Sequence, residues 1–374
     1  MAPVIQRLAQ TTGIDSHVCV TAQHRQMLDQ VLNLFAIQPD YDLDLMRDDQ
    51  SLAGLSAAIF TNLEPIFADF EPDWVLVQGD TTTVAITSLL AYYRRIKVGH
   101  VEAGLRTHDK WQPFPEEINR RVAGVVADLH FAPTQQAREN LLREGTPDET
   151  IAVTGNPVID ALKFVAEQPE PLEIVNLLEK LEVTSPALDV PKNTATHLRA
   201  AHSRQQLILV TAHRRENFGQ PLENICLVLK ELAERGDVEI VYPVHLNPNV
   251  QEPVKRILGN VPHVTLLPPL DYLPLVHLQK HAKIILTDSG GIQEEAPAFG
   301  VPVLVLREVT ERPEGVAAGT LKLVGTEADH IIREAKRLLD NPIAHAKMAK
   351  ASNPFGDGHA AERIVEAIQG FSYR

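Results

Sequence analysis

The sequence has few cysteines, and the two that it has lie far apart. Cys19 and Cys226 have neither the spacing of a disulfide framework nor the clustering of a zinc site. No run of about 18 apolar residues occurs, so no membrane span is predicted, and we find no signal-peptide pattern. These absences predict a cytoplasmic protein without a metal site.

An excess of basic residues is also lacking. The 374 residues include 35 lysines and arginines against 49 aspartates and glutamates, a formal net charge of −14. This balance excludes nucleic acid and anionic membrane surfaces as main partners, because both attract positive charge. An anionic small ligand still fits, since a few local cations decide its binding. The GxGxxG fingerprint is missing too, so a nicotinamide cofactor is not indicated. No other cofactor is predicted.

Short apolar runs alternate with helix-like stretches along most of the chain. We expect strands at residues 17–21, 74–78, 97–101, 130–132, 207–211, 239–242, 264–267, 284–286 and 303–305. This alternation is typical of parallel sheets covered by helices. Residues 165–205 contain Pro169, Pro171, Pro186 and Pro191 and read as a linker. The sequence therefore predicts two doubly wound Rossmann-like domains, with ligands at the carboxyl ends of the strands, in a shared cleft.

One stretch combines a strand with a glycine turn. The apolar run 284–286 leads into Ser289, Gly290 and Gly291, and Gln293 follows as part of a helix start. Ser289 is suited to cap this helix, and the glycines let a ligand approach the backbone closely. The turn can therefore hold phosphate oxygens. A tight strand-to-helix turn without a ligand is the alternative interpretation.

Three carboxylates follow or border predicted strands and helices of the first half. Asp80 and Glu102 each come directly after a strand, and Glu116 stands at a proline-stiffened helix start. Side chains of this type share proton-transfer tasks when they lie close together. Each also has a structural alternative: Asp80 as a helix cap, Glu102 as the partner of Arg106, and Glu116 as a favourable charge at a helix N-terminus.

Basic side chains follow the strands of the second half. His213 and Arg214 come after residues 207–211, in a pattern that suits a diphosphate. The alternative is a surface ion-pair cluster with Glu216. His245 also ends a strand and is equally consistent with a structural loop histidine. Arg312 either reaches a ligand or pairs with a neighbouring glutamate, Glu311 or Glu314.

Nine motifs along the chain together resemble a known family. They are Thr21-Ala22-Gln23-His24, Gly79-Asp80-Thr81, His100-Val101-Glu102-Ala103-Gly104-Leu105-Arg106, Pro115-Glu116-Glu117, Thr211-Ala212-His213-Arg214-Arg215-Glu216, Tyr242-Pro243-Val244-His245, Asp288-Ser289-Gly290-Gly291, Thr310-Glu311-Arg312-Pro313-Glu314 and Asn353-Pro354-Phe355-Gly356-Asp357-Gly358. In order and content they are similar to those of the non-hydrolysing bacterial UDP-N-acetylglucosamine 2-epimerases.

The resemblance implies a GT-B-like fold. Residues 1–170 would form the domain that carries the carboxylates, and residues 171–357 the UDP-binding domain. A helix within residues 358–374 would cross back to the first domain. The family also implies a homodimer.

The resemblance further implies the reaction. UDP-GlcNAc and UDP-ManNAc would interconvert when UDP is eliminated to leave 2-acetamidoglucal and is added back with inversion at C2. Two other classes stay open: a catalytically impaired UDP-sugar-binding protein and a glycosyltransferase of the same fold. A hydrolysing epimerase that releases free ManNAc is a further variant.

Roles are implied residue by residue. The catalytic group would be Asp80, Glu102, Glu116 and His213. UDP would be bound by Ser289, Gly290, Gly291, Glu295 and Arg312. An allosteric pocket for a second UDP-GlcNAc matches Gln23, Gln26, Arg214 and His245. The arginine position of that pocket corresponds to Asp49 here, with Arg47 two residues earlier.

The first residues depart from the family pattern. Members of the family begin with a strand and a Gly-Thr-Arg-Pro-Glu-Ala-Ile-Lys turn before the residues that match Met1, and this sequence has neither. We therefore expect the chain as given to be weakly active, and restoration of the strand and turn to restore turnover.

Overall fold

The computed structural model describes residues 1–22, 25–45, 47, 50–183 and 205–371. The chain forms two compact units. Unit 1 comprises Met1–Lys163 and Phe355–Arg374, and unit 2 comprises Phe164–Pro354. Among the described residues, no helix is both long enough and apolar enough to cross a membrane.

Unit 1 contains a parallel sheet of four strands. In spatial order these are β3 (Trp74–Gln78), β4 (Lys97–Val101), β5 (Leu129–Ala132) and β6 (Ile151–Val153). The register pairs Gln78 with Val101, so the residues that follow β3 and β4 are neighbours at one edge of the sheet. This edge carries Asp80 and Glu102.

Two shorter strands of unit 1 form a sheet of their own. These strands, β1 (Cys19–Val20) and β2 (Tyr41–Asp42), pair in parallel. The strand expected at residues 17–21 is therefore shorter than predicted. The reason is local: the Val18 N–H donates to the Asp40 carboxylate at 2.7 Å rather than to a neighbouring strand.

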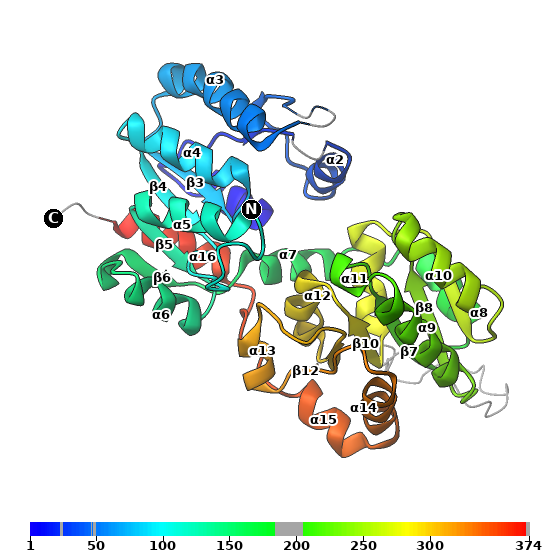
Figure 1. Ribbon diagram of the computed structural model, residues 1–374. Coiled ribbons are helices and arrows are strands. Elements are labelled where there is room, and N and C mark those ends of the chain that lie inside the picture. The colour runs from blue at the N-terminus through cyan, green and yellow to red at the C-terminus, as the bar shows by residue number, and fades with distance from the viewer. Residues whose placement is uncertain (23–24, 46, 48–49, 184–204, 372–374) are drawn as a thin grey trace, which may run out of the picture. The chain divides into compact units, whose positions relative to one another are not determined.

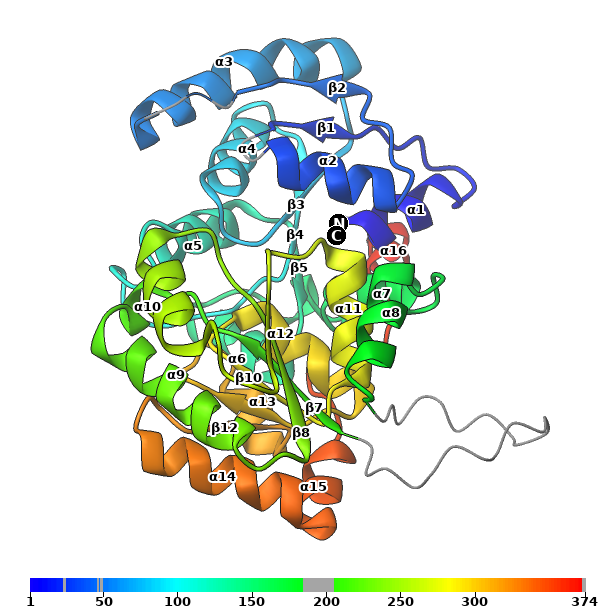
Figure 2. The ribbon, with the colours of Figure 1, turned by 90° about the vertical axis from the view of Figure 1, so that its right-hand side faces the viewer.

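Helices cover both faces of the four-stranded sheet. One face packs against α3 (Leu52–Phe70), α4 (Thr82–Tyr93) and α5 (Glu116–Val126). The other face packs against α1 (Ala2–Ala9) and α16 (Ala360–Gly370), which lie side by side in Figure 2. The expected C-terminal helix thus returns to unit 1, where the Asp160 carboxylate accepts the N–H groups of Ala360 and Ala361. The remaining helices of this part of the chain are α2 (Arg25–Leu34), α6 (Gln135–Arg143) and α7 (Pro157–Ala166).

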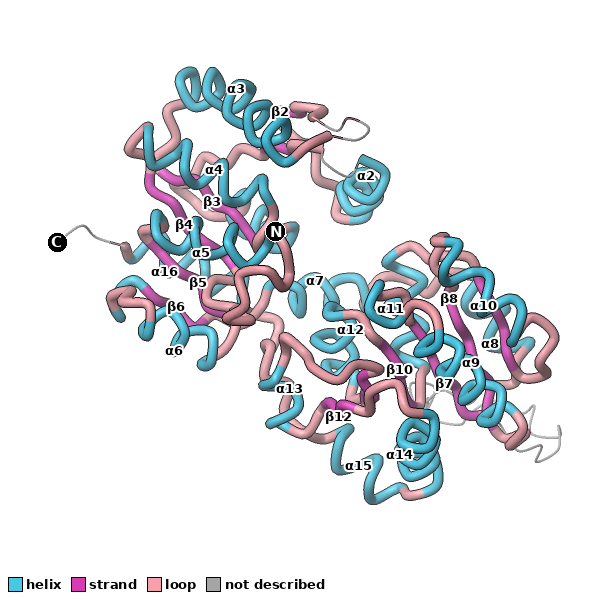
Figure 3. The backbone as a smooth tube through the Cα atoms, in the orientation of Figure 1, coloured by secondary structure: helices cyan, strands magenta, loops and turns pink. Residues whose placement is uncertain are grey.

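Unit 2 is built on a parallel sheet of six strands (Figures 1 and 3). In spatial order they are β12 (Leu321–Leu323), β11 (Val303–Val305), β10 (Ile284–Thr287), β7 (Gln206–Thr211), β8 (Val238–Pro243) and β9 (Val264–Leu267). This is the Rossmann order, which reverses direction between β7 and β10. Ligands of such folds bind where the two central strands end. His213 follows β7 and Ser289 follows β10.

Both faces of this sheet are buried as well. The helices α9 (Gln220–Ala233), α10 (Pro248–Leu258), α14 (Ala328–Asp340) and α15 (Pro342–Ala349) enclose one core. The helices α8 (Leu172–Lys180), α11 (Tyr272–His281) and α12 (Gly290–Glu295) enclose the other. A further short helix, α13 (Pro313–Ala318), follows β11. The predicted class of doubly wound α/β units is confirmed.

The interpretation of residues 165–205 as a linker is wrong in part. Residues 172–180 form α8, whose Ile174 is buried in the core of unit 2. The prolines at 169 and 171 lie just before the helix and do not interrupt it. Residues 184–204, which include the other two prolines, lie outside the described residues.

Candidate active site

The glycine turn of unit 2 lies beside two arginines. A Cβ atom built on Gly290 would be 3.6 Å from Nη2 of Arg214 and 3.7 Å from Nη2 of Arg312. Two guanidinium groups therefore converge on the backbone that opens α12. A turn of this kind offers an anion both backbone N–H groups and bidentate cationic donors.

Ser289 stands at the N-cap position of α12, but its side chain makes no capping hydrogen bond. The expected N-cap position of Ser289 is therefore confirmed, but its side chain does not supply the capping hydrogen bond. Its own N–H donates to Oγ1 of Thr287 at 2.9 Å, which fixes the backbone of the turn.

A buried aspartate ties this turn to the loop that carries His213. Asp288 is fully buried and accepts the N–H groups of His213 at 2.9 Å and of Arg214 at 2.8 Å. The side-chain amide of Asn217 donates to the same carboxylate at 3.0 Å. The ends of the two central strands are thereby locked together, with His213 and Arg214 held beside the glycine turn.

His213 stacks on His245, with ring centroids 5.4 Å apart and an interplanar angle of 15°. Burial lowers the pKa of His213, the Asp288 carboxylate partly offsets this, and His245 and Arg214 lower it further. The ring is therefore mostly neutral at pH 7 and can donate one hydrogen bond. Glu216 pairs instead with Arg307 at 2.5 Å, so the alternative of an ion-pair cluster between Glu216 and the histidine loop is wrong.

A buried glutamate orients Arg312. Its Nε donates to Oε1 of Glu294 at 2.6 Å, and Glu294 is 3% exposed. The neighbouring Glu311 is more distant, at 3.9 Å from Nη1. The alternative that Arg312 pairs chiefly with Glu311 is therefore wrong, because the contact with Glu294 is much shorter.

Glu295 is buried at the other end of α12. Oε1 accepts the Tyr272 hydroxyl at 3.2 Å, and Oε2 accepts the side-chain amide of Gln279 at 2.8 Å. Burial raises the pKa of Glu295 to about 7, the two hydrogen bonds partly offset this, and Glu294 adds to it. This carboxyl group is therefore poised to change its charge near neutral pH.

In unit 1, Asp80 forms an ion pair with Arg120 of α5. Thr81, rather than Asp80, caps α4, so the capping alternative for Asp80 is wrong. Arg120 also contacts Glu117 at 3.3 Å, and Glu117 is fully buried. The guanidinium group thus links the end of β3 to the helix that begins with Glu116.

Glu102 lies directly beside Gly79, since a Cβ built on Gly79 would be 3.4 Å from Oε2 of Glu102. Its backbone has a positive φ of 63°, a strained conformation that is frequent at functional sites. The Gln78 side chain donates to Glu102 at 3.2 Å. Arg106 instead forms a bidentate pair with Glu144 at 2.9 and 2.8 Å, so the predicted alternative of a Glu102–Arg106 pair is wrong.

Glu116 begins α5, which fits its alternative role as a favourable charge at a helix N-terminus. In the described part of the chain, however, its Oε2 is buried without a hydrogen-bond partner. Buried carboxylate oxygens are rarely left unpaired, so this atom is available to a ligand or a proton.

His100 fixes the turn before Asp80. Its Nε2 lies 2.8 Å from the Gly79 carbonyl oxygen, which accepts a hydrogen bond. Burial lowers the pKa of His100 to about 4, so the ring is neutral at pH 7.

Sequence reasoning missed the side chains that hold the predicted ones in place. These are Arg120, Asn217, Asp288, Tyr272, Gln279 and Glu294. The signal was weak but present for one pair: Tyr272 and Gln279 are seven residues apart on one helix and therefore share a face.

The predicted allosteric residues are described only in part. Gln23 and Asp49 lie outside the described residues, and Gln26 is placed only as part of α2. Arg47 donates to the Asp44 carbonyl oxygen at 2.9 Å. Among the described residues, no group of three or more histidines, cysteines, aspartates or glutamates could hold a metal ion.

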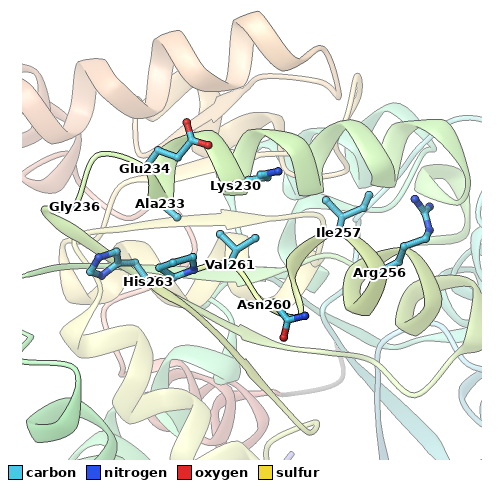
Figure 4. Close-up of a pocket in the computed structure, with 10 residues that line it drawn as sticks. Lys230, Ala233, Glu234, Gly236, Arg256, Ile257, Asn260, Val261 and His263 are labelled. Atoms are coloured by element: carbon cyan, nitrogen blue, oxygen red, sulfur yellow. The ribbon is translucent and has the colours of Figure 1, made fainter.

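A pocket of about 430 Å³ lies at the opposite end of the unit 2 sheet (Figure 4). Its lining includes Lys230, Glu234, Arg256 and His263, from α9, α10 and the residues before β9. In Figure 4 the side chain of Glu234 lies at one side of the lining and that of Arg256 at the other. None of the predicted site residues lines this pocket.

The chain has two doubly wound units. One carries an arginine-lined glycine turn, and the other carries carboxylates at a sheet edge. This combination defines a two-unit α/β enzyme of the GT-B-like class. A family model described as UDP-N-acetylglucosamine 2-epimerase matches residues 6–369. The chain therefore belongs to the UDP-N-acetylglucosamine 2-epimerase family.

Individual relatives agree with this assignment. The UDP-N-acetylglucosamine 2-epimerase of Salmonella typhimurium is 52% identical over 372 residues, which is 99% of this chain and 95% of the relative. The crystal structure of UDP-GlcNAc 2-epimerase from Neisseria meningitidis, bound to UDP-GlcNAc, is 48% identical with a TM-score of 0.85, over 99% of this chain and 95% of that one. A Methanocaldococcus jannaschii UDP-GlcNAc 2-epimerase, in complex with UDP-GlcNAc and UDP, is 31% identical with a TM-score of 0.76, over 98% and 95%.

Proposed function

We propose that this protein is an isomerase that interconverts UDP-GlcNAc and UDP-ManNAc by inversion at C2, without a cofactor. The observation that carries the proposal is the similarity of 99% of the chain to a UDP-N-acetylglucosamine 2-epimerase with about half of the residues identical. The two sets of side chains in the two units supply the chemistry.

Elimination comes first in this proposal. A carboxylate removes the C2 proton while the C1–O bond to UDP breaks, and the bonding electron pair leaves with the UDP oxygen. The products are 2-acetamidoglucal and UDP. In the return step the UDP oxygen forms the C1–O bond again, and C2 takes a proton on the opposite face.

Asp80, Glu102 and Glu116 supply the acids and bases of these steps. Two observations support this: Asp80 and Glu102 follow neighbouring strands, and Arg120 connects Asp80 to the helix of Glu116. The C2 proton has no neighbouring carbonyl to acidify it, so base catalysis alone is insufficient. Stabilisation of the leaving diphosphate must therefore supply part of the rate.

In unit 2, we assign the diphosphate to Ser289, Gly290, Gly291 and Arg312, and the ribose hydroxyl groups to Glu295. The convergence of two guanidinium groups on Gly290 supports the first assignment. His213, mostly neutral and held by Asp288, donates a hydrogen bond to the departing diphosphate.

Nuclear magnetic resonance of the sugar products tests the activity. We expect UDP-GlcNAc and UDP-ManNAc, supplied separately, to reach the same mixture without an added acceptor and without free ManNAc. Release of free ManNAc would identify a hydrolysing enzyme, and a requirement for an acceptor would identify a glycosyltransferase. UDP binding without conversion would identify the impaired binding protein. The named relatives favour the epimerase over these alternatives.

We also propose that a second UDP-GlcNAc activates the enzyme through Gln23, Gln26, Arg214 and His245. The stacking of His245 on His213 and the place of Arg214 beside Gly290 would couple such a pocket to the diphosphate. Conversion of UDP-ManNAc alone should then begin with a lag that added UDP-GlcNAc abolishes. A linear time course from the start would contradict the regulation and leave the epimerase activity intact.

We further propose a homodimer that works in the cytoplasm. Tyr92, Tyr93 and Val125 expose large apolar side chains on α4 and α5, at 60%, 64% and 86%. A second copy that covers them would bury this surface. The thiols of Cys19 and Cys226 are not disulfide-bonded, in keeping with a reducing compartment. Sedimentation should give twice the chain mass, and Val125→Glu should give the monomer.

A further inference from the structure

Among the described residues, the Glu295 carboxylate has one hydrogen-bond donor on each oxygen. The Tyr272 hydroxyl lies 3.2 Å from Oε1, and the Gln279 side-chain amide lies 2.8 Å from Oε2. Both donors come from α11, and this helix packs into the second core of unit 2. The plane of the carboxylate is therefore fixed by two contacts rather than one.

This arrangement leaves a defined acceptor surface. A carboxylate oxygen accepts about two hydrogen bonds, so each oxygen of Glu295 keeps one acceptor direction after its protein donor is counted. Two remaining acceptor sites on one carboxylate match two hydroxyl groups on neighbouring carbon atoms. A vicinal diol is the chemical group that this geometry selects.

The position of the carboxylate connects the diol to the anion. A Cβ atom built on Gly291 would be 3.9 Å from Oε1 of Glu295, so the carboxylate borders the glycine turn that the two arginines approach. A ligand with a diphosphate at the turn would therefore place its adjoining ribose near Glu295. This step rests on the function proposed above.

Burial works against this acceptor. It raises the pKa of Glu295 to about 7, and Gln279 and then Tyr272 pull the value down by hydrogen bonding to the charged form. Gln279 is itself fully buried, and in the described part of the chain its Oε1 has no partner. Burial of the unpaired amide oxygen costs free energy. The amide N–H group of the same side chain lowers the pKa of Glu295 and so favours the charged carboxylate.

We propose that Tyr272 and Gln279 are positioning residues that hold Glu295 as an oriented carboxylate, and that this trio selects ribonucleotides over 2′-deoxyribonucleotides. Glu295 contacts the ribose, whereas Tyr272 and Gln279 act through it. None of these three side chains is assigned a role in the proton transfer at C2, which is assigned to unit 1.

Calorimetric affinities for UDP and 2′-deoxy-UDP test the proposal. The unmodified protein should prefer UDP by about tenfold or more, because a charged acceptor loses a hydroxyl partner in the deoxy compound. Tyr272→Phe and Gln279→Leu should each reduce that preference by several-fold, and Glu295→Gln should nearly abolish it. KM for UDP-GlcNAc should rise in the two positioning variants, with kcat changed by less than about threefold.

Matched controls are available on the surface. Tyr41→Phe removes the same hydroxyl group from a partly exposed tyrosine of β2, and Gln220→Leu makes the same exchange at an exposed position of α9. Both should leave the preference unchanged. A folded Tyr272→Phe or Gln279→Leu variant with the full preference for UDP would overturn the proposal. If one of the two variants does not fold, the other still decides.

The outcomes separate this inference from the function beneath it. A protein that binds neither UDP nor UDP-GlcNAc overturns the proposed function. A protein that epimerises UDP-GlcNAc but binds UDP and 2′-deoxy-UDP equally overturns the ribose selection alone. The pH dependence gives a second readout: the pH below which UDP-GlcNAc binding declines should move upward in Gln279→Leu, which a purely structural role would not cause.

Discussion

The two units hold their acidic side chains in different ways. In unit 2 the acids beside the turn are buried: Asp288, Glu294 and Glu295 are 0%, 3% and 6% exposed, and each is engaged by donors of its own unit. In unit 1 the Asp80 side chain is 32% exposed, and Glu116 has a buried oxygen without a partner in the described residues. Fixed acids orient a ligand, whereas accessible or unpaired ones can exchange a proton. We therefore expect unit 2 to bind the nucleotide and unit 1 to carry the acid–base groups, as proposed above.

The largest effect is expected when the carboxylate charges of unit 1 are removed, because the acid–base roles are assigned to them. Glu102→Gln and Glu116→Gln should each lower kcat by about 100-fold or more, since general acid–base groups contribute factors of this size. The dissociation constant of UDP should stay within about twofold, because UDP binding is assigned to unit 2. Glu139→Gln, on α6, is the control and should keep full turnover. An unchanged rate in both variants would remove these residues from the mechanism.

The reverse experiment removes a cation from unit 2. Arg312→Leu should weaken UDP binding by about 10- to 100-fold, because one charge-assisted contact to a phosphate is lost. Calorimetry measures this directly. Arg256→Leu is a matched control, since Arg256 pairs with Glu223 and Glu252 on the far side of unit 2. Equal UDP affinities for the two variants would show that Arg312 does not contact the diphosphate.

A third test uses the raised pKa of Glu295. The free protein carries a protonated Glu295 below about pH 7, whereas the ribose is assigned to the charged form. Affinity for UDP-GlcNAc should therefore fall as the pH drops below 7, by up to about tenfold per pH unit. The Glu102→Gln background prevents turnover during the titration. In Glu295→Gln the same titration should be flatter, and an equally steep curve would assign the effect to another group.

Linkage gives the opposite sign for the stability of the free protein. The folded pKa of Glu295 lies above the ordinary value, so the folded state takes up the proton first as the pH falls. The cost of burying the charge is present above about pH 7 and disappears toward pH 4.5. Acidification therefore removes the cost of burying the Glu295 charge in the free protein, while it lowers the affinity for UDP-GlcNAc.

The smallest expected effect concerns the buried histidines of unit 1. His100 and His130 are paired across β4 and β5, and burial lowers the pKa of each to about 4. The unfolded chain binds these protons first, so their contribution to stability is complete above about pH 6.5 and is lost as the pH falls toward 4. Between these limits His130→Gln should reduce the slope of unfolding free energy against pH by up to about 1.4 kcal/mol per pH unit.

Tryptophan fluorescence reads this transition selectively, because both tryptophans, Trp74 and Trp111, lie in unit 1. Denaturant titrations at several pH values give the slope for each protein. Identical slopes for the unmodified protein and His130→Gln would mean that His130 is already protonated in the folded state.

The sequence predicted most strands of the two larger sheets, because parallel strands buried on two faces read as continuous apolar runs. Residues 284–287 are an example: all four are buried in β10. The sequence missed β6 and β12, which are three-residue strands at the edges of their sheets. The helix α8 is not predicted because the prolines just before it are typical of a linker. The strand at 17–21 was overestimated because a side chain, Asp40, competes for the Val18 N–H. Apolar patterning does not record such competition.

For the candidate site, the sequence located the motif residues but not what holds them. Asp80, Glu102 and His213 were placed by their positions at strand ends, which is a local signal. The partners Arg120, Gln78 and Asp288 depend on contacts between distant segments, such as the hydrogen bonds from the His213 loop to Asp288. Pairing of this kind follows from tertiary structure. The sequence suggested partners only among residues close in the chain, such as Arg106 for Glu102.

The central claim is that unit 1 moves a proton at C2 of a sugar whose nucleotide unit 2 holds. Incubation with UDP-GlcNAc in D₂O, followed by proton NMR, tests it most directly. We predict that deuterium enters C2 as UDP-ManNAc forms, and that Glu102→Gln and Glu116→Gln slow this incorporation while UDP remains bound. A sugar that keeps its C2 proton throughout, with UDP bound to the unmodified protein, would contradict the account.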